Sequence, residues 1–337
     1  ISQLFPYMPD IGGLLHANVE YAVRDSIYHV KADLGVDTLS YERKSLGDIQ
    51  LDASYMPGTG KSHHIDAHLL HNKNEVLAAT GAYYQLGNQD SLQSRLKITN
   101  LPLWMANPFI PEDMANMAGA LEGQMEVTGH MKQPDINGYV NLDTASVFVV
   151  PAGARFRFDD KRIEIKNNRF LFNQYHIISS GDNPFTIDGV VDASDFANMT
   201  ANLTLSANNM EVLNVKRNKE SLVYGKVYID LNSTVKGPFD ALVMRGNIEL
   251  LGNTNATYVL KDSPLTVQDR LSDIVTFVNF ADTAQLQKVE EQPLKLGGLD
   301  MLLTIHIDQA VQLNVDLSED RQSYVNAEGG GDLSFQY

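Results

Sequence analysis

The stretch that decides the fold is Ala120–Leu142, which reads ALEGQMEVTGHMKQPDINGYVNL. In its first part, apolar side chains such as Met125 and Val127 alternate with polar ones. This period of two predicts a half-buried β-strand. Gly129 ends the strand, a polar loop follows, and Gly138 opens a second alternating run. We therefore predict a strand, a turn marked by glycine, and a second strand.

The same device recurs later in the chain. Eight residues separate Gly129 from Gly138, and eight also separate Gly237 from Gly246. A glycine suits the start of a strand because it tolerates positive φ and the close approach of a neighbouring backbone. Repeated β units predict a sheet that grows by stacking, since one unit cannot bury its apolar face alone. The alternative is that any all-β protein has glycines in its turns.

Alternating runs fill most of the remaining chain, and turn signals recur every eight to twelve residues, as in all-β proteins. Near the carboxy terminus the alternation is most regular, from 299 onward. The runs predicted as strands in the first hundred residues are Leu14–Val23, Tyr28–Leu34, Ile49–Tyr55, His63–Leu70, Glu75–Tyr83 and Leu92–Ile98.

Two segments interrupt the strands and predict short helices. Near 111–118, Pro111 is followed by two acidic residues, and Gly119 lies at the far end, which is typical of helix termini. Near 267–280, apolar residues recur at helical spacing after a capping-box pattern. We interpret the single tryptophan, Trp104, as a core aromatic at a corner.

Composition excludes several classes of function. The chain has 337 residues, 43% of them hydrophobic, which is enough for a core. Its net charge of −16 argues against nucleic acid and against electrostatic docking on an anionic membrane. It has no cysteine, which excludes disulfides, zinc–thiolate sites and cysteine nucleophiles. No apolar run is long enough for a transmembrane helix.

Two motifs suggest chemistry that their surroundings do not support. Pro57–Ser62 resembles the end of a phosphate-binding loop, but Tyr55 occupies the position of its first glycine and a strand pattern follows. His64, Asp66 and His68 share a strand face and could form a zinc-type ligand set, although a solvated strand face explains them equally well. We expect no metal, no cofactor and no enzymatic activity, because no acid–base set is clustered.

The glycine pattern resembles a known family. Three parts of the chain are similar to the carboxy-terminal part of the TamB proteins, which are related to the AsmA-like group. They are Gly119–Gly129 followed by Pro134–Leu142, a second copy in Gly225–Leu231 with Gly237 and Gly246, and the block Phe156–Val191. The resemblance covers most of residues 110–337. In the second copy a proline follows Gly237 directly, so the two loops must differ.

The resemblance implies a fold, a location and partners. TamB-like proteins are periplasmic, are anchored in the inner membrane by an amino-terminal helix, and reach the outer membrane. They form a long curved β-sheet with an open apolar groove, a β-taco, and work with an outer-membrane barrel of the TamA or BamA type. The implied function is outer-membrane biogenesis, through phospholipid transport along the groove, through assembly and secretion of outer-membrane proteins, or through both. On this basis we expect the chain to lack that anchoring helix and to be a segment of a longer protein.

We therefore expect residues 1–337 to form one continuous β-groove, with candidate junctions at 101–119 and 262–298. An apolar sheet face can instead close on a second sheet, so the rival hypotheses are a structural β-solenoid or adhesin-like scaffold with a dry core, and an enzyme built on a solenoid. The parity of the strands predicts which side chains line the groove: Met125, Val127, Val227, Ile229, Leu231, Leu303, Ile305, Ile307, Leu313 and Val315.

Overall fold

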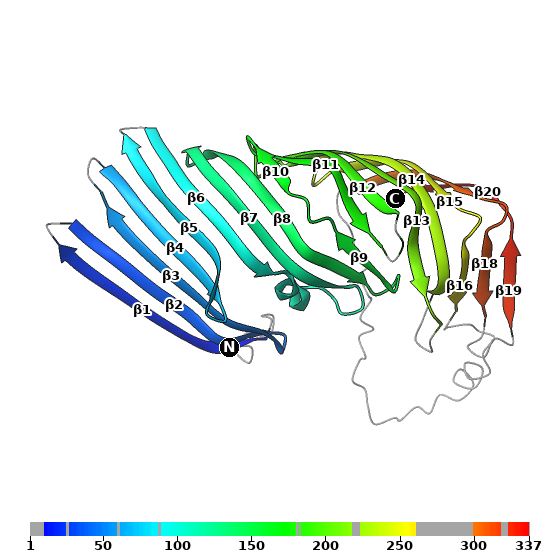
Figure 1. The fold of residues 1–337 in the computed structure, drawn as a ribbon, viewed down its shortest axis with the longest axis horizontal. Coiled ribbons are helices and arrows are strands. Elements are labelled where there is room, and N and C mark those ends of the chain that lie inside the picture. The colour runs from blue at the N-terminus through cyan, green and yellow to red at the C-terminus, as the bar shows by residue number, and fades with distance from the viewer. Residues whose placement is uncertain are drawn as a thin grey trace, which may run out of the picture. The chain divides into compact units, whose positions relative to one another are not determined.

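The chain is nearly all β, as the sequence predicts (Figure 1). The computed structural model describes residues 10–24, 27–58, 61–86, 89–179, 181, 183–217, 223–260, 299–317 and 323–336. The six strands predicted in the first hundred residues are all present, and each is longer than its sequence pattern. The predicted helix at 267–280 lies outside the described residues.

The described residues form twenty strands and one 3₁₀ helix. Their bounds are β1 Ile11–Arg24, β2 Ile27–Tyr41, β3 Lys44–Pro57, β4 Ser62–His71, β5 Asn74–Leu86, β6 Gln89–Pro102, η2 Leu103–Phe109, β7 Ala115–His130, β8 Gln133–Val149, β9 Ala154–Phe158, β10 Ile163–Lys166, β11 Arg169–Ile178, β12 Pro184–Asp192, β13 Thr200–Val215, β14 Val223–Pro238, β15 Leu242–Leu250, β16 Asn255–Val259, β17 Leu299–Ile307, β18 Gln312–Asp316, β19 Tyr324–Glu328 and β20 Gly331–Gln336.

The chain divides into two compact units, which we describe separately. The candidate junction at 101–119 falls inside the first unit. The first unit consists of Ile1–Val150, Arg155–Ile178 and Thr186–Leu203, and the second of Pro151–Ala154, Ser179–Phe185 and Thr204–Tyr337.

The first unit is an antiparallel meander. Each strand from β1 to β8 pairs with the next along the chain, as Figure 1 shows, and β8 continues to β10 and β11. Three of its hairpins close through two-residue turns in which both residues have positive φ, at Glu42-Arg43, Asn72-Lys73 and Asn167-Asn168. This is the geometry of type I′ turns, whose twist matches that of the paired strands.

The central hairpin is tighter than the sequence suggests. β7 continues through Gly129 to His130, the turn occupies residues 131 and 132, and Pro134 already pairs with Gly129 inside the ladder. The predicted polar loop is therefore wrong. Gly138 does not open a strand, because it lies inside β8. The predicted reason for a glycine there is confirmed, since it has φ of +151° and a Cβ would overlap the carbonyl oxygen of Gln124. No other residue fits this position without moving the neighbouring strand.

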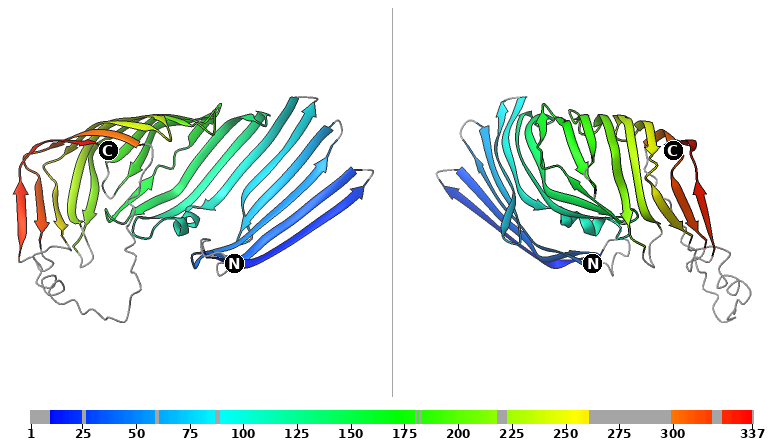
Figure 2. Two further views of the ribbon diagram at one scale, coloured as in Figure 1. Left: turned by 180° about the vertical axis from the view of Figure 1, so that it is seen from behind. Right: turned by 45° about the vertical axis from the view of Figure 1, so that its right-hand side comes forward.

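The helix predicted near 111–118 is also wrong. Residues 112–114 form a turn, and β7 begins at Ala115, paired with Val149 of β8. Eight residues make a marginal helix on their own, so pairing with a preformed neighbouring strand prevails over local end signals. The helical turn lies earlier, in η2, and Figure 2 shows it beside β7. The Asn107 side chain holds it there, accepting from the Met117 N–H at 2.7 Å and donating to the Met117 carbonyl at 2.9 Å.

Several strands contain a single residue with left-handed backbone, and an aspartate on a following segment caps it. Such residues have φ between 45° and 51°, and each donates its backbone N–H to the capping carboxylate. The carboxylate satisfies an N–H that the irregular ladder leaves without a strand partner. The pairs are Thr38 with Asp48, Thr144 with Asp160, and Gln174 with Asp188 in the first unit, and Asn209 with Asp230 in the second, at 2.8, 3.3, 2.8 and 2.6 Å.

The second unit is built on the long strand β14. Part of β14 pairs with β15 and part with β16, so β15 and β16 form one strand interrupted at residues 251–254. β17 and β18 repeat the interruption and pair in parallel with β15 and β16, respectively, while β20 and β19 complete the unit in antiparallel pairing. Thr254 and Val311 lie at successive interruptions, and both are 1% exposed.

Candidate functional site

One face of the first unit is apolar across seven strands. Side chains that are directly opposite in an antiparallel ladder point to the same face, so the register assigns them to common rows. The alanine row contains Val19, Ala32, Ala53, Ala67, Ala79, Leu96 and Met125; the leucine row contains Ala17, Leu34, Leu51, Leu69, Leu77 and Ile98; and a third row contains Tyr21, Val30, Tyr55, Ile65, Gly81, Ser94 and Val127.

No second layer covers this face in the described part of the first unit. Val19 is 62% exposed and Ile65 is 48% exposed, and the other side chains of the three rows are half-buried or exposed. Two of the predicted groove residues, Met125 and Val127, belong to the face and are half-buried. An apolar surface of this extent is uncommon on a protein without a partner or ligand.

The 3₁₀ helix η2 marks one end of the apolar face. His71 follows Leu69 with the same parity on β4, and its ring lies 5.6 Å from that of Trp104. Trp104 is 37% exposed, so the expectation of a core aromatic is wrong. The tryptophan lies over the edge of a sheet that is one layer thick, where no second layer is present to bury it.

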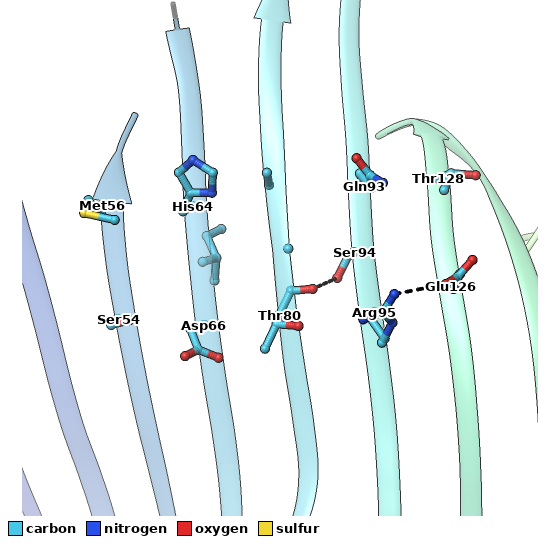
Figure 3. A pocket seen from close by; sticks show the side chains of 13 residues that line it. Ser54, Met56, His64, Asp66, Thr80, Gln93, Ser94, Arg95, Glu126 and Thr128 are labelled. Atoms are coloured by element: carbon cyan, nitrogen blue, oxygen red, sulfur yellow. Dashed lines mark hydrogen bonds and ion pairs between the residues drawn. The ribbon is translucent and has the colours of Figure 1, made fainter. Parts of the chain in front are cut away.

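The opposite face of the same strands is polar. Its side chains surround a shallow depression of about 540 Å³, shown in Figure 3, where Arg95 and Glu126 form an ion pair at 3.3 Å. The candidate metal ligands also lie on this face. Both ring nitrogens of His68 contact carboxylates, Nε2 that of Asp66 at 3.1 Å and Nδ1 that of Glu75 at 2.7 Å. These contacts, led by the hydrogen bond to Glu75, raise the pKa of His68.

The ion pairs and hydrogen bonds among these side chains account for the polar character of this face without a bound ligand. Among the described residues, no three histidine or acidic side chains are arranged to hold a metal ion. The loop that resembles a phosphate-binding motif is a hairpin, since the N–H of Gly58 donates to the carbonyl of Ser62 at 2.7 Å and strand β4 follows. Of the two faces, the apolar one is therefore the candidate site.

The second unit has an apolar face of its own, and six predicted groove residues share it. The register arranges these residues in rows across the sheet. One row contains Leu231, Ile248, Ile305 and Leu333, and the next contains Ile229, Leu250 and Ile307. Leu303 lies opposite Phe335. Val227 precedes Ile229 by two residues on β14. Leu231 and Leu303 are buried, whereas Leu333 at the edge is 57% exposed.

The remaining two predicted residues lie beyond the strand interruptions. Leu313 of β18 is 38% exposed, and it and Val315 are opposite Ala256 and Tyr258 of β16. In this part the neighbouring parity is buried instead, and Tyr224 donates to the carboxylate of Asp316 at 2.9 Å. The alternation of residues within one strand therefore does not predict which face a side chain occupies beyond an interruption.

A second buried carboxylate, that of Glu211, lies on β13. Glu211 is 6% exposed and accepts a hydrogen bond from the Tyr228 hydroxyl at 2.7 Å, and this bond raises the pKa of Tyr228. The side chain of Asn214 donates to the same carboxylate at 2.8 Å. These bonds stabilise a buried charge, which is a structural role.

Comparison with known proteins identifies the family. Residues 174–337 match the family model described as the TamB C-terminal domain. This part of the chain belongs to the TamB family. The family is envelope-associated and is named for the translocation and assembly module. No curated protein and no solved structure gave a match. Among the described residues, no helix is long and apolar enough to cross a membrane.

Most residues of the apolar face were missed by sequence reasoning. The strands that carry the alanine and leucine rows precede the TamB match, and their alternation was recognised. Alternation predicts which residues share a face within one strand, but any even shift of register preserves it. Complementary lengths of neighbouring runs and their two-residue turns are the signal that could have placed Leu51, Leu69 and Leu77 in one row.

Proposed function

We propose that this TamB-family chain carries phospholipid acyl chains on its apolar sheet face during outer-membrane biogenesis. The observation that supports the proposal most directly is the uncovered face of the first unit, which is seven strands wide and has a polar reverse side. Acyl chains bind through apolar area, at about 0.8 kcal/mol per buried CH₂, so the negative charge of the protein does not oppose binding.

The proposal extends to location and partner. The chain acts in the periplasm, between an inner-membrane anchor and an outer-membrane barrel of the TamA or BamA type, and it assists assembly or secretion of outer-membrane proteins. The TamB match supports this part of the proposal. The predicted groove residues that lie on the apolar faces of the two units, including Met125 and Ile305, are proposed as contacts of the acyl chains.

Photocrosslinking tests the proposal. A benzophenone amino acid replaces Ile305 in one protein and the adjacent Thr304, whose side chain is on the other face of β17, in a control. We expect co-purified phospholipid to be crosslinked at 305 and not at 304. Absence of lipid at both positions, in protein shown to be folded by circular dichroism, would favour a structural scaffold instead.

A further inference from the structure

Five aromatic rings form a continuous ladder along one margin of the apolar face of the first unit. Neighbouring ring centroids are 6.4, 5.9, 5.8 and 5.8 Å apart from β1 to β5, and the rings are stacked or tilted. The ladder consists of Tyr21, Tyr28, Tyr55, His63 and Tyr83.

The register places this aromatic ladder on the apolar face. Tyr21 and Tyr55 belong to the third row, and His63 precedes Ile65 of that row by two residues. Tyr83 is opposite His63. The ladder is next to the hairpin connections after β1, β3 and β5, at the end of the strands opposite to η2.

The aromatic ladder differs from the rest of the face because it carries hydrogen-bonding atoms. The hydroxyls of Tyr28 and Tyr55 are 3.5 Å apart, and the Tyr55 hydroxyl is 2.6 Å from Nδ1 of His63. Exposed Lys61 precedes His63 by two residues at the same margin. Tyrosine rings with an apolar body and a polar tip favour the boundary between hydrocarbon and lipid headgroups.

The apolar span along the strands is long enough for the acyl chains of one lipid leaflet. On β5 the apolar face presents Leu77, Ala79, Gly81 and Tyr83 in succession. Tyr83 lies six positions after Leu77, which corresponds to ~20 Å at the rise of a β-strand. The hydrocarbon of one leaflet is about 15 Å thick, half of the ~30 Å core.

We propose that the aromatic ladder is a headgroup site, which binds the phosphate and glycerol ester oxygens of a phospholipid while its acyl chains lie along the strands over the alanine and leucine rows. This inference rests on the proposed function, because it assigns an orientation to the lipid that the face carries. Tyr28, Tyr83 and His63 supply hydrogen-bond donors to the ester and phosphate oxygens.

Crosslinking from one strand tests the orientation. A benzophenone amino acid is placed at 77, 83 or 84 of the full chain, and the protein is loaded with palmitoyl-oleoyl phosphatidylglycerol. Mild alkaline hydrolysis cleaves the acyl esters and so distinguishes the captured atoms. It leaves fatty acid on the peptide if a chain reacted, and the deacylated glycerophosphate head, here glycerophosphoglycerol, if the head reacted. Tyr84, adjacent to Tyr83 but on the other face, is the matched control.

We expect mainly fatty acid on the peptide at 77, mainly the glycerophosphate head at 83, and no lipid at 84. The ratio of glycerophosphate head to fatty acid should be about fivefold higher at 83 than at 77. Equal ratios at 77 and 83 would overturn the orientation and leave the proposed function standing. Lipid at neither 77 nor 83 above the level at 84 would remove both.

A second comparison isolates the hydroxyls. With the probe at 83, Tyr28→Phe combined with Tyr55→Phe keeps both rings but removes two polar tips, and we expect the ratio of glycerophosphate to fatty acid to fall about threefold. The control is Tyr84→Phe with the probe again at 83, and it should leave the ratio unchanged. If a change at position 84 perturbs folding, Tyr139→Phe serves as the control instead. An unchanged ratio in the double variant would limit the ladder to packing between strands.

Discussion

An uncovered apolar face makes a quantitative prediction about two isoleucines of the first unit. Ile65 lies on the face and is 48% exposed, whereas Ile165 is 1% exposed. Replacing isoleucine by alanine removes three carbons, worth about 0.8 kcal/mol each when fully buried. Ile65→Ala should therefore lower the free energy of unfolding by about 1 kcal/mol, and Ile165→Ala by about 2–5 kcal/mol because a cavity is added.

Urea denaturation of delipidated protein measures both values, and the fluorescence of Trp104, the single tryptophan, reports unfolding of the first unit. Any loss of strand propensity is common to the two changes and cancels in their difference. Equal costs for the two variants, within about 0.5 kcal/mol, would refute an open face, because Ile65 would then be as well covered in solution as Ile165.

Three further predictions concern the scaffold. Gly138→Ala, at positive φ and against the backbone of the next strand, should lower the urea midpoint strongly, whereas Gly331→Ala, with no atom within 4 Å of its added carbon, should leave the midpoint nearly unchanged. The hydrogen bond to Asp332 raises the pKa of His306, so this pair stabilises β20 below pH 6.5 and loses its effect as the pH rises through the raised pKa. After correction for the intrinsic exchange rate at each pH, the protection of β20 amides should be lower at pH 8 than at pH 6, and Asp332→Asn should remove this difference. Asp188→Ala should cost about 1 kcal/mol in urea unfolding through loss of a backbone cap, and a cost below that of Asp188→Asn would contradict the capping role.

Much of this fold could be predicted from the sequence, and the failures have physical causes. The strands followed from alternation because a one-layer sheet with one apolar and one polar face imposes a strict period of two. The helix near 111–118 failed because end signals describe an isolated segment, while Ala115 finds its backbone partner in β8. The aspartate caps left no signature, since Thr38 and Gln174 differ in type and lie at different distances in sequence from their caps.

The candidate site was only partly predictable for a related reason. Parity correctly grouped Ile305 with Ile307, because both lie on one uninterrupted strand. Parity could not relate these two residues to Leu313, since residues 308–311 separate strand β17 from strand β18 along the chain. The rows of the first unit required the register, which comes from turn lengths and long-range pairing and not from the pattern within each run.

The meander of the first unit has a consequence for how such a protein can change length. Because each strand from β1 to β7 pairs only with its sequence neighbours among the described residues, one hairpin can be duplicated or deleted without rethreading the others. Each hairpin adds two strand spacings, ~10 Å, to the apolar face and leaves its width along the strands unchanged. Gene duplication can therefore lengthen the apolar face in fixed steps of one hairpin, without any change in the strands that are already present.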